Sequence, residues 1–282
     1  MKGGVYMKLK RKARKSIVFV LVIIMTLTVF SLFNLNIKSK FSQLVKAFEK
    51  TRILHNVKEY DKLETERFVI RYEDDKKNAE LTAKILSKYY DQVCSMFDYY
   101  PEEKVVIIIY NNGEDLVDNT RLKKDTPPLG VYYSGTINIL SPKVWLSQNE
   151  SYEEAFEKNG PVVHEFAHQV VDDITNGNYP IWLTEGIALY VEYKTTGFEW
   201  GSEIKNGNDI TVEDLTNKFY DIDTGLSYRK SFEVVSSISE NWGFDKLKLL
   251  LDTLGDGNSM DKSTQKVLKV NLMDIDKTLL KE

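Results

Sequence analysis

The chain is organised around residues 161–173, PVVHEFAHQVVDD. This stretch holds two of the three histidines of the chain, His164 and His168, with Glu165 directly after the first. In a helix, residues at i and i+4 lie on the same face, so both imidazoles can bind one divalent metal ion with the glutamate beside it. A proline in the first turn and the Asn-Gly pair at 176–177 are typical of the two ends of a helix. The stretch therefore predicts a buried metal-binding helix.

The alternative is that two core histidines share this helix without a metal. A buried Glu-His-His group would then leave polar atoms to satisfy inside an apolar helix, at a cost of a few kcal/mol. The spacing and that cost favour the metal-binding interpretation.

Length, charge and cysteine content limit the class of protein. The chain has 282 residues, enough for one large domain or two lobes. The formal net charge is −4, but residues 1–40 carry nine basic side chains and no acidic one, so residues 41–282 carry −13. Such an acidic body argues against nucleic acid as a partner. Cys94 is the only cysteine, which excludes an intramolecular disulfide and a thiolate metal cluster.

Residues 17–37 form an uncharged, apolar run that follows a basic tail over residues 1–16. Twenty-one helical residues are long enough to cross a bilayer core of about 30 Å. The excess of basic residues before the run predicts a single-pass membrane protein, with a cytoplasmic amino terminus and the remainder outside the cytoplasm. A cleaved signal peptide, and hence a secreted protein, is the alternative, although the sequence after the run offers no convincing small-residue cleavage site.

The rest of the chain predicts an α+β fold. Residues 38–62 are expected to form a juxtamembrane stalk, and residues 63–282 the folded domain. Within the domain, alternating or continuous apolar runs predict strands. Apolar residues at helical spacing predict a long helix between the first and the second strand. The expected elements are strands over 66–72, 104–110 and 136–140, and a helix over 76–99. Because Pro142 follows the last strand, we expect that strand at the edge of a small mixed or antiparallel sheet, beside the metal-binding helix. A helical lobe is expected to follow.

A catalytic zinc ion takes three protein ligands and leaves one position open, and two histidines with one glutamate are a common set. Residues 181–192, IWLTEGIALYVE, predict a second helix entered through Pro180 or capped by Thr184. Glu185 in its early turns lies far enough from the first helix for the chain to turn and return, and it is the favoured third ligand. Glu192, two turns later, is its rival.

Two acidic residues follow the second histidine closely on the first helix. Asp172 and Asp173 are too near to His168 in sequence to be the favoured third ligand. Either they orient an imidazole N–H as hydrogen-bond acceptors, or they form a charge pair at the helix end.

At this point the sequence resembles the gluzincin zinc metallopeptidases, specifically the thermolysin-like peptidase MA-like domain. The resemblance is carried by HEFAH at 164–168 and WLTEGIA at 182–188, and it extends from about residue 64 to the carboxyl terminus. It implies one zinc ion bound by His164, His168 and Glu185, with Glu165 as the general base. The segment from 226 to 243 is similar to a helix of the family that begins Tyr-x-x-Ser. Within it, Tyr228 is the candidate donor to the oxyanion, and its alternative role is packing at a lobe interface.

Two departures from the family pattern matter. Many gluzincins carry an aspartate four residues after the glutamate ligand, where this chain has Leu189. The aminopeptidase branch carries a Gly-x-Met-Glu-Asn segment that binds the free amine of the substrate, and nothing between Leu129 and Pro142 matches it. An endopeptidase is therefore favoured over an aminopeptidase.

The expected function is a membrane-anchored zinc endopeptidase that hydrolyses peptides or proteins with a zinc-activated water. Two other classes stay open. One is a tethered binding or structural module with an inactive peptidase-like fold, against which the intact Glu165 argues. The other is a zinc hydrolase of cell-wall amides, which the sequence does not distinguish from a peptidase.

Overall fold

The structure is a computed structural model of the chain, which falls into two compact units, residues 1–45 and residues 46–282. The described residues are 25, 42–73, 76–122, 126–146, 151–204 and 209–279. The predicted basic tail and, apart from Met25, the predicted anchor over 17–37 lie outside them. Among the described residues, no helix combines the length and the apolar character needed to cross a membrane.

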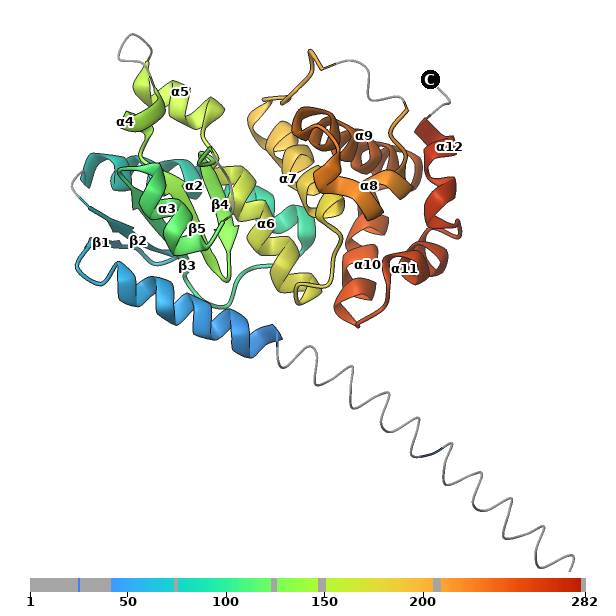
Figure 1. Cartoon of the computed structure of the whole chain (residues 1–282), viewed down its shortest axis with the longest axis horizontal. Coiled ribbons are helices and arrows are strands. Elements are labelled where there is room, and N and C mark those ends of the chain that lie inside the picture. Colours follow the sequence, from blue (N-terminus) through green and yellow to red (C-terminus); the bar gives the residue numbers. More distant parts are fainter. Residues whose placement is uncertain are drawn as a thin grey trace, which may run out of the picture. The chain divides into compact units, whose positions relative to one another are not determined.

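The larger unit contains a five-stranded sheet with the order β1-β2-β3-β5-β4 (Figure 1). Its strands are β1 (Asp61–Glu64), β2 (Phe68–Tyr72), β3 (Val105–Tyr110), β4 (Gly130–Tyr133) and β5 (Thr136–Leu140). The three inner strands β2, β3 and β5 are parallel, and the two outer strands β1 and β4 are antiparallel to their neighbours. The sheet is therefore mixed, and the α+β class predicted from the sequence is confirmed.

Helices alternate with and follow these strands. Their bounds are α2 (Lys76–Phe97), α3 (Gly113–Thr120), α4 (Pro142–Trp145), α5 (Tyr152–Asn159), α6 (Val162–Thr175), α7 (Ile181–Thr196), α8 (Val212–Lys218), α9 (Thr224–Trp242), α10 (Phe244–Gly255), α11 (Met260–Val267) and α12 (Asp276–Leu279), with short 3-10 turns η1 (Phe219–Asp221) and η2 (Leu272–Asp274). Residues 46–56 are also helical.

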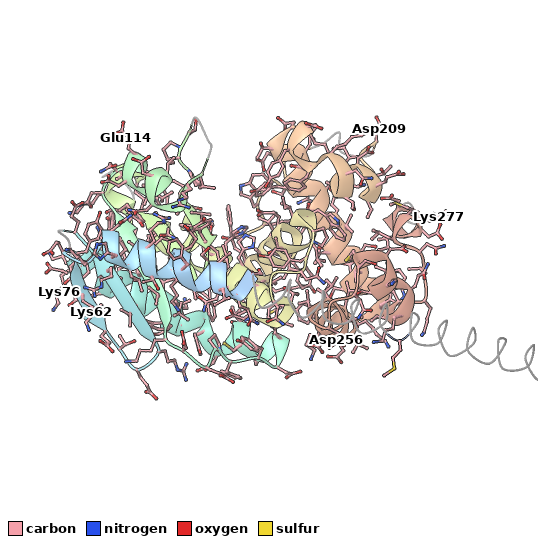
Figure 2. All side chains as sticks on the ribbon, turned by 60° about the horizontal axis from the view of Figure 1, so that its bottom comes forward. Lys62, Lys76, Glu114, Asp209, Asp256 and Lys277 are labelled. Carbon is pink, nitrogen blue, oxygen red and sulfur yellow. The ribbon has the colours of Figure 1, made fainter. Side chains whose placement is uncertain are left out.

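The central strand β3 separates two apolar clusters. Successive side chains of a strand point to opposite faces, so Ile107 and Ile109 join the main core with α2 and α6, whereas Ile108 and Tyr110 face the other way. There they pack with α3 and with the helix over 46–56, which lies in front of the sheet in Figure 2. The sheet is therefore covered on both faces, and α6 is held against it from the side of the main core.

The strand expected at the sheet edge is internal. β5 lies between β3 and β4, so the prediction that residues 136–140 form the edge was wrong. Pro142 suggested the edge position, but it lies beyond the strand in the first turn of α4 and removes no hydrogen bond from the sheet. The edge strand beside α6 is β4, whose Tyr132 donates its backbone N–H to Glu165 on that helix.

The larger unit begins at Lys46, well before residue 63, where the sequence suggested that the domain starts. Two residues explain the difference, because Ile53 and Val57 are almost fully buried and pack against the sheet. Phe48, on the same helix, is exposed instead.

After α6 the larger unit is entirely helical among the residues described. α7 packs against both α6 and α9, and α10 packs against the same two helices. α6 therefore belongs to both halves of this unit, with the sheet on one side and the helical part on the other (Figure 1).

Candidate metal centre

The first three candidate residues lie on α6, which begins after Pro161 and ends at Asn176 in the left-handed conformation, as the sequence predicts. His164 and His168 are one turn apart, and their Nε2 atoms are 3.1 Å from each other. The stacking of Tyr90 on Phe166 joins α6 to α2 on the opposite side of the helix. The two imidazoles are thus presented by a helix that is fixed in the core.

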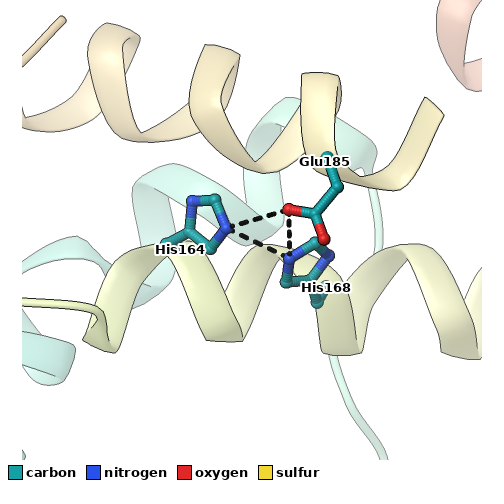
Figure 3. Close-up of side chains that lie close together, drawn as sticks. All are labelled: His164, His168 and Glu185. Carbon is teal, nitrogen blue, oxygen red and sulfur yellow. Dashed lines mark hydrogen bonds and ion pairs between the residues drawn. The ribbon is translucent and has the colours of Figure 1, made fainter. Parts of the chain in front are cut away.

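The fourth candidate, Glu185, comes from α7, which lies alongside α6 (Figure 3). Its Oε2 atom is 3.5 Å from the Nε2 of His164 and 3.4 Å from the Nε2 of His168. α7 begins directly after Pro180 without a side-chain cap, so entry through the proline is correct and capping by Thr184 is not. The three candidate ligands, from two different helices, surround one point.

The spacing of these atoms suits a metal ion. Tetrahedral coordination with ligand distances of about 2.0–2.2 Å places neighbouring donor atoms about 3.3–3.6 Å apart. The three measured separations lie close to this range. In addition, Glu185 Oε2 is buried and has no hydrogen-bond partner in the described structure, although buried carboxylate oxygens are normally paired. The three donor atoms therefore fit a single metal ion.

The Nδ1 atom of each ring, on the side away from the shared centre, faces an oxygen atom that can orient the ring. The Nδ1 of His168 lies 2.6 Å from the hydroxyl of Thr184, and the Nδ1 of His164 lies 3.7 Å from Glu192 Oε2. With a proton on each Nδ1, both Nε2 lone pairs point at the shared centre, which is the tautomer that metal binding requires. Thr184 is thus positioned to orient His168, and Glu192 to orient His164.

The electrostatics of the cluster favour a cation. Burial raises the pKa of Glu185, but the adjacent imidazoles outweigh it and hold this pKa well below its ordinary value. Burial alone would lower the pKa of His164, and the carboxylates of Glu185 and Glu192 raise it well above the usual range. The centre therefore keeps its carboxylate ionised and draws positive charge to the rings.

Glu165 lies next to this cluster and is bound to the edge strand. The backbone N–H of Tyr132 in β4 donates to Glu165 Oε2 over 2.6 Å. Gly130 permits this approach, since a Cβ at that position would lie 2.6 Å from Pro161 and 3.0 Å from Cγ of Glu165. Burial raises the pKa of Glu165, and the nearby imidazoles offset only part of the effect. A carboxylate with a raised pKa is a better proton acceptor near neutral pH.

Tyr228, on α9, also reaches the cluster. Its hydroxyl donates a 3.0 Å hydrogen bond to Glu185 Oε1, whereas the ion-pair contacts with the two histidines are made by Oε2. Its ring packs against Trp200 and Phe219, each with centroids 5.9 Å away. Burial and the charge of Glu185 raise its pKa well above the ordinary value, so the phenol stays protonated and remains a donor.

Asp172 and Asp173 do not orient an imidazole. Asp172 accepts hydrogen bonds from the hydroxyls of Tyr132 and Tyr179 and pairs with Lys46, which also contacts Asp173. The orienting role that the sequence offered to these aspartates falls instead to Thr184 and Glu192.

Two histidines and a glutamate around one point, with a second glutamate at their side, define a metallohydrolase type of site. Residues 94–280 match the Peptidase MA superfamily, which is more than half of the chain. The chain belongs to this superfamily, and its domain is metallopeptidase-like. The matched region begins in α2 and includes the candidate ligands His164, His168 and Glu185 as well as Glu165 and Tyr228. A search of curated proteins found no match.

Proposed function

We propose that the protein is a zinc-dependent endopeptidase with His164, His168 and Glu185 as ligands and Glu165 as general base. The observation that carries the proposal is the pairing of a three-residue ligand set with an adjacent buried carboxylate that does not belong to it. A structural zinc site is closed by four protein ligands, whereas a catalytic one keeps a position open. Three candidate donors together with Glu165 support the catalytic class.

Zinc bound by these residues would supply Lewis acidity, which brings the pKa of a water molecule down to about 7. Glu165 would accept the proton of the attacking water and later donate it to the leaving amine. Tyr132 N–H, by holding one oxygen of Glu165, leaves the other carboxylate oxygen for this transfer. Tyr228 is the proposed donor to the oxyanion. Its single O–H binds Glu185 Oε1 in this structure, and it would exchange that acceptor for the oxyanion as negative charge develops.

We further propose that the substrates are internal peptide bonds and that the domain acts outside the cytoplasm. Support for endopeptidase activity is the absence of an amine-binding Gly-x-Met-Glu-Asn sequence in residues 129–142. Support for the location is the uncharged run over 17–37 after a basic tail, which is the pattern of a single-pass anchor. The body is acidic, in keeping with a protein or peptide partner rather than nucleic acid.

The test is Glu165→Gln in the purified full-length chain. We expect the variant to keep stoichiometric zinc, measured by elemental analysis, because Glu165 is not proposed as a ligand. Its rate of cleavage of a random peptide mixture should fall by about a hundredfold or more. Glu154→Gln, an exposed position on α5, is the matched control and should cleave as the wild type does.

Full activity of Glu165→Gln would sink the peptidase proposal. Zinc binding by the wild type without hydrolysis of peptides would point to the binding module. Cleavage of cell-wall fragments but not of peptides would point to the amide hydrolase.

A further inference from the structure

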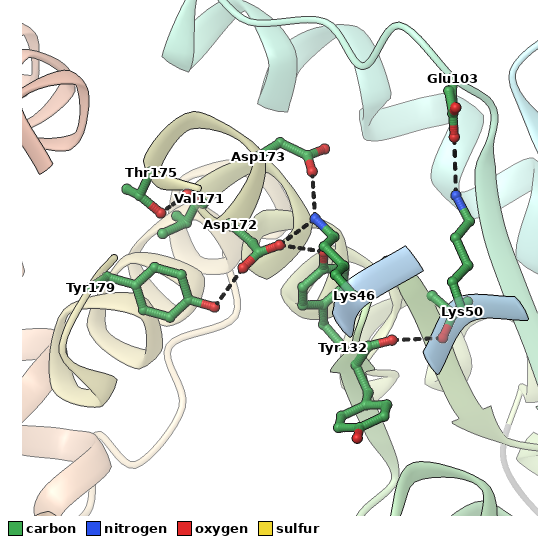
Figure 4. A network of polar contacts seen from close by, with 11 residues as sticks. Lys46, Lys50, Glu103, Tyr132, Val171, Asp172, Asp173, Thr175 and Tyr179 are labelled. Carbon is green, nitrogen blue, oxygen red and sulfur yellow. Dashed lines mark hydrogen bonds and ion pairs between the residues drawn. The ribbon is translucent and has the colours of Figure 1, made fainter. Parts of the chain in front are cut away.

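The helix over residues 46–56 contacts the candidate site through a network of buried charges and phenols (Figure 4). Lys46 pairs with Asp172 and, at 3.0 Å, with Asp173, and both carboxylates are largely buried on α6. Tyr132 and Tyr179 donate their hydroxyls to Asp172 at 2.7 and 3.2 Å. Lys46 lies upstream of the region matched by the superfamily, which begins at residue 94.

Tyr132 connects this network to the general base. Its hydroxyl binds Asp172, and its backbone N–H binds Glu165, seven residues earlier on the same helix. Seven residues are two helical turns, so one residue of the edge strand is attached to α6 at two points. The position of β4 relative to Glu165 therefore depends on where Asp172 holds the phenol.

Lys46 is the cation that contacts this attachment. It shares Oδ2 of Asp172 with the hydroxyl of Tyr132, and its ammonium group lies 5.7 Å from the centre of the Tyr132 ring. Without this charge, the adjacent carboxylates of Asp172 and Asp173 would repel each other in a poorly solvated place. Asp172 would then turn toward water and release Tyr132.

The same helix contacts the next residue of β4. Glu49 is buried and pairs with Arg52 and Arg121 at 2.9 Å, and the hydroxyl of Tyr133 donates to it at 3.4 Å. The helix over 46–56 is thus attached to two consecutive residues of the edge strand.

We propose that Lys46 is a positioning residue of the metal centre, acting through Asp172 and Tyr132 on the backbone N–H that holds Glu165. This inference rests on the proposed function for its catalytic consequence, but its structural consequence can be measured without any substrate. The segment ahead of the superfamily match is then a working part of the catalytic site.

The experiment compares Lys46→Met, Lys46→Arg and Lys50→Met in the full-length chain. Lys50 lies on the same helix and pairs at 3.1 Å with the exposed Glu103, so its variant is a matched control for losing one lysine. We expect Lys46→Met to raise deuterium exchange in residues 130–140. Its kcat on the best-cleaved peptide of a random mixture should fall about tenfold to a hundredfold, with KM within about threefold because binding contacts stay. Lys46→Arg should restore both, and Lys50→Met should match the wild type.

Tyr132→Phe keeps the backbone N–H but removes the hydroxyl. It replaces Lys46→Met in the test if that variant fails to fold. It should show the same exchange and kcat changes. The double variant Lys46→Met/Tyr132→Phe should lose little more kcat than either single variant, because both substitutions act through the contact between Tyr132 and Asp172. Unchanged exchange in residues 130–140 for either folded variant would overturn the inference, as would strictly additive losses. If the wild type cleaves no peptide, the proposed function fails, and the exchange measurement alone still decides the role of Lys46.

Discussion

Glu185 and Glu192 contact different nitrogens of His164, and this difference separates a ligand from an orienting residue. Glu185 approaches Nε2 together with His168, whereas Glu192 approaches Nδ1 on the far side of the ring. We expect Glu185→Ala to lose stoichiometric zinc. Glu192→Gln should keep zinc with affinity weakened about 10–100-fold, as is usual for residues that orient a ligand. Competition with a chelator of known affinity measures both. If Glu185→Ala retained zinc and Glu192→Gln lost it, Glu192 would be the ligand and Glu185 the residue that orients His164.

Tyr228 is bound to the ligand carboxylate, so its removal should affect metal binding as well as catalysis. Tyr228→Phe deletes the hydrogen bond to Glu185 Oε1, and we expect zinc affinity to weaken about tenfold. If the phenol turns from Glu185 to the oxyanion in the transition state, kcat of the variant at saturating zinc should fall by about a hundredfold. Zinc titration and kinetics at saturating zinc separate the two effects. An unchanged affinity would contradict the positioning part of this prediction.

At the residue scale, the sequence identifies those candidate residues whose spacing along a helix carries information. His164, Glu165 and His168 follow from the period of 3.6, and the structure brings Glu185 to the first and third of them. Tyr132 was not predicted, because its contact with Glu165 is made by the backbone and any residue could make it. Thr184 lies directly before a candidate ligand, but a threonine at that position is also typical of a helix cap, so the sequence alone does not reveal its contact with His168.

At the scale of elements, the packing of α7 on α9 fixes where Glu185 lies. Gly186 follows the candidate ligand directly, and a Cβ there would lie 2.3 Å from the backbone oxygen of Ser231 on α9. Any larger residue must push the two helices apart and move the carboxylate with them. The glycine is therefore required by helix packing rather than by its backbone conformation.

Gly186→Ala should destabilise the domain by about 1–3 kcal/mol, as overpacking in a core does, and should weaken zinc binding at the same time. Urea unfolding of the metal-free protein gives the stability, and chelator competition gives the affinity. Glu240→Ala, at an exposed position on α9, should change the free energy of unfolding by less than about 0.5 kcal/mol. Wild-type stability of Gly186→Ala would show that α7 and α9 are not held in contact here.

The elements that the sequence predicts well are those with a strong apolar pattern. The helix expected over 76–99 is α2, and the continuous apolar run at 104–110 is the central strand β3. β1 was not predicted, since its sequence DKLE is polar and it pairs on one side only. Strand order was the other failure, because it depends on contacts between distant segments and the proline after β5 lies outside the sheet.

At the scale of the larger unit, the metal centre joins its two halves. His164 and His168 belong to a helix that packs on the sheet, and Glu185 to a helix that packs on the carboxyl-terminal helices. One bound ion would therefore cross-link α6 and α7. Without the ion, ionised Glu185 has a buried oxygen with no hydrogen-bond partner in the described structure, which weakens the contact between the halves.

Zinc should consequently raise the melting temperature of the protein. A ligand that binds only the folded state at a hundred times its Kd stabilises it by about 2.7 kcal/mol, which for a domain of this size corresponds to a rise of about 5–10 °C. Calorimetry with added zinc, and then with excess chelator, should show the rise and its reversal. His168→Ala should show no rise, because two remaining donors hold the ion poorly, whereas His55→Ala, at an exposed position on the helix over 46–56, should respond as the wild type does. A zinc-dependent rise that persists in His168→Ala would place the bound ion elsewhere in the molecule and remove the support for α6 and α7 as its site.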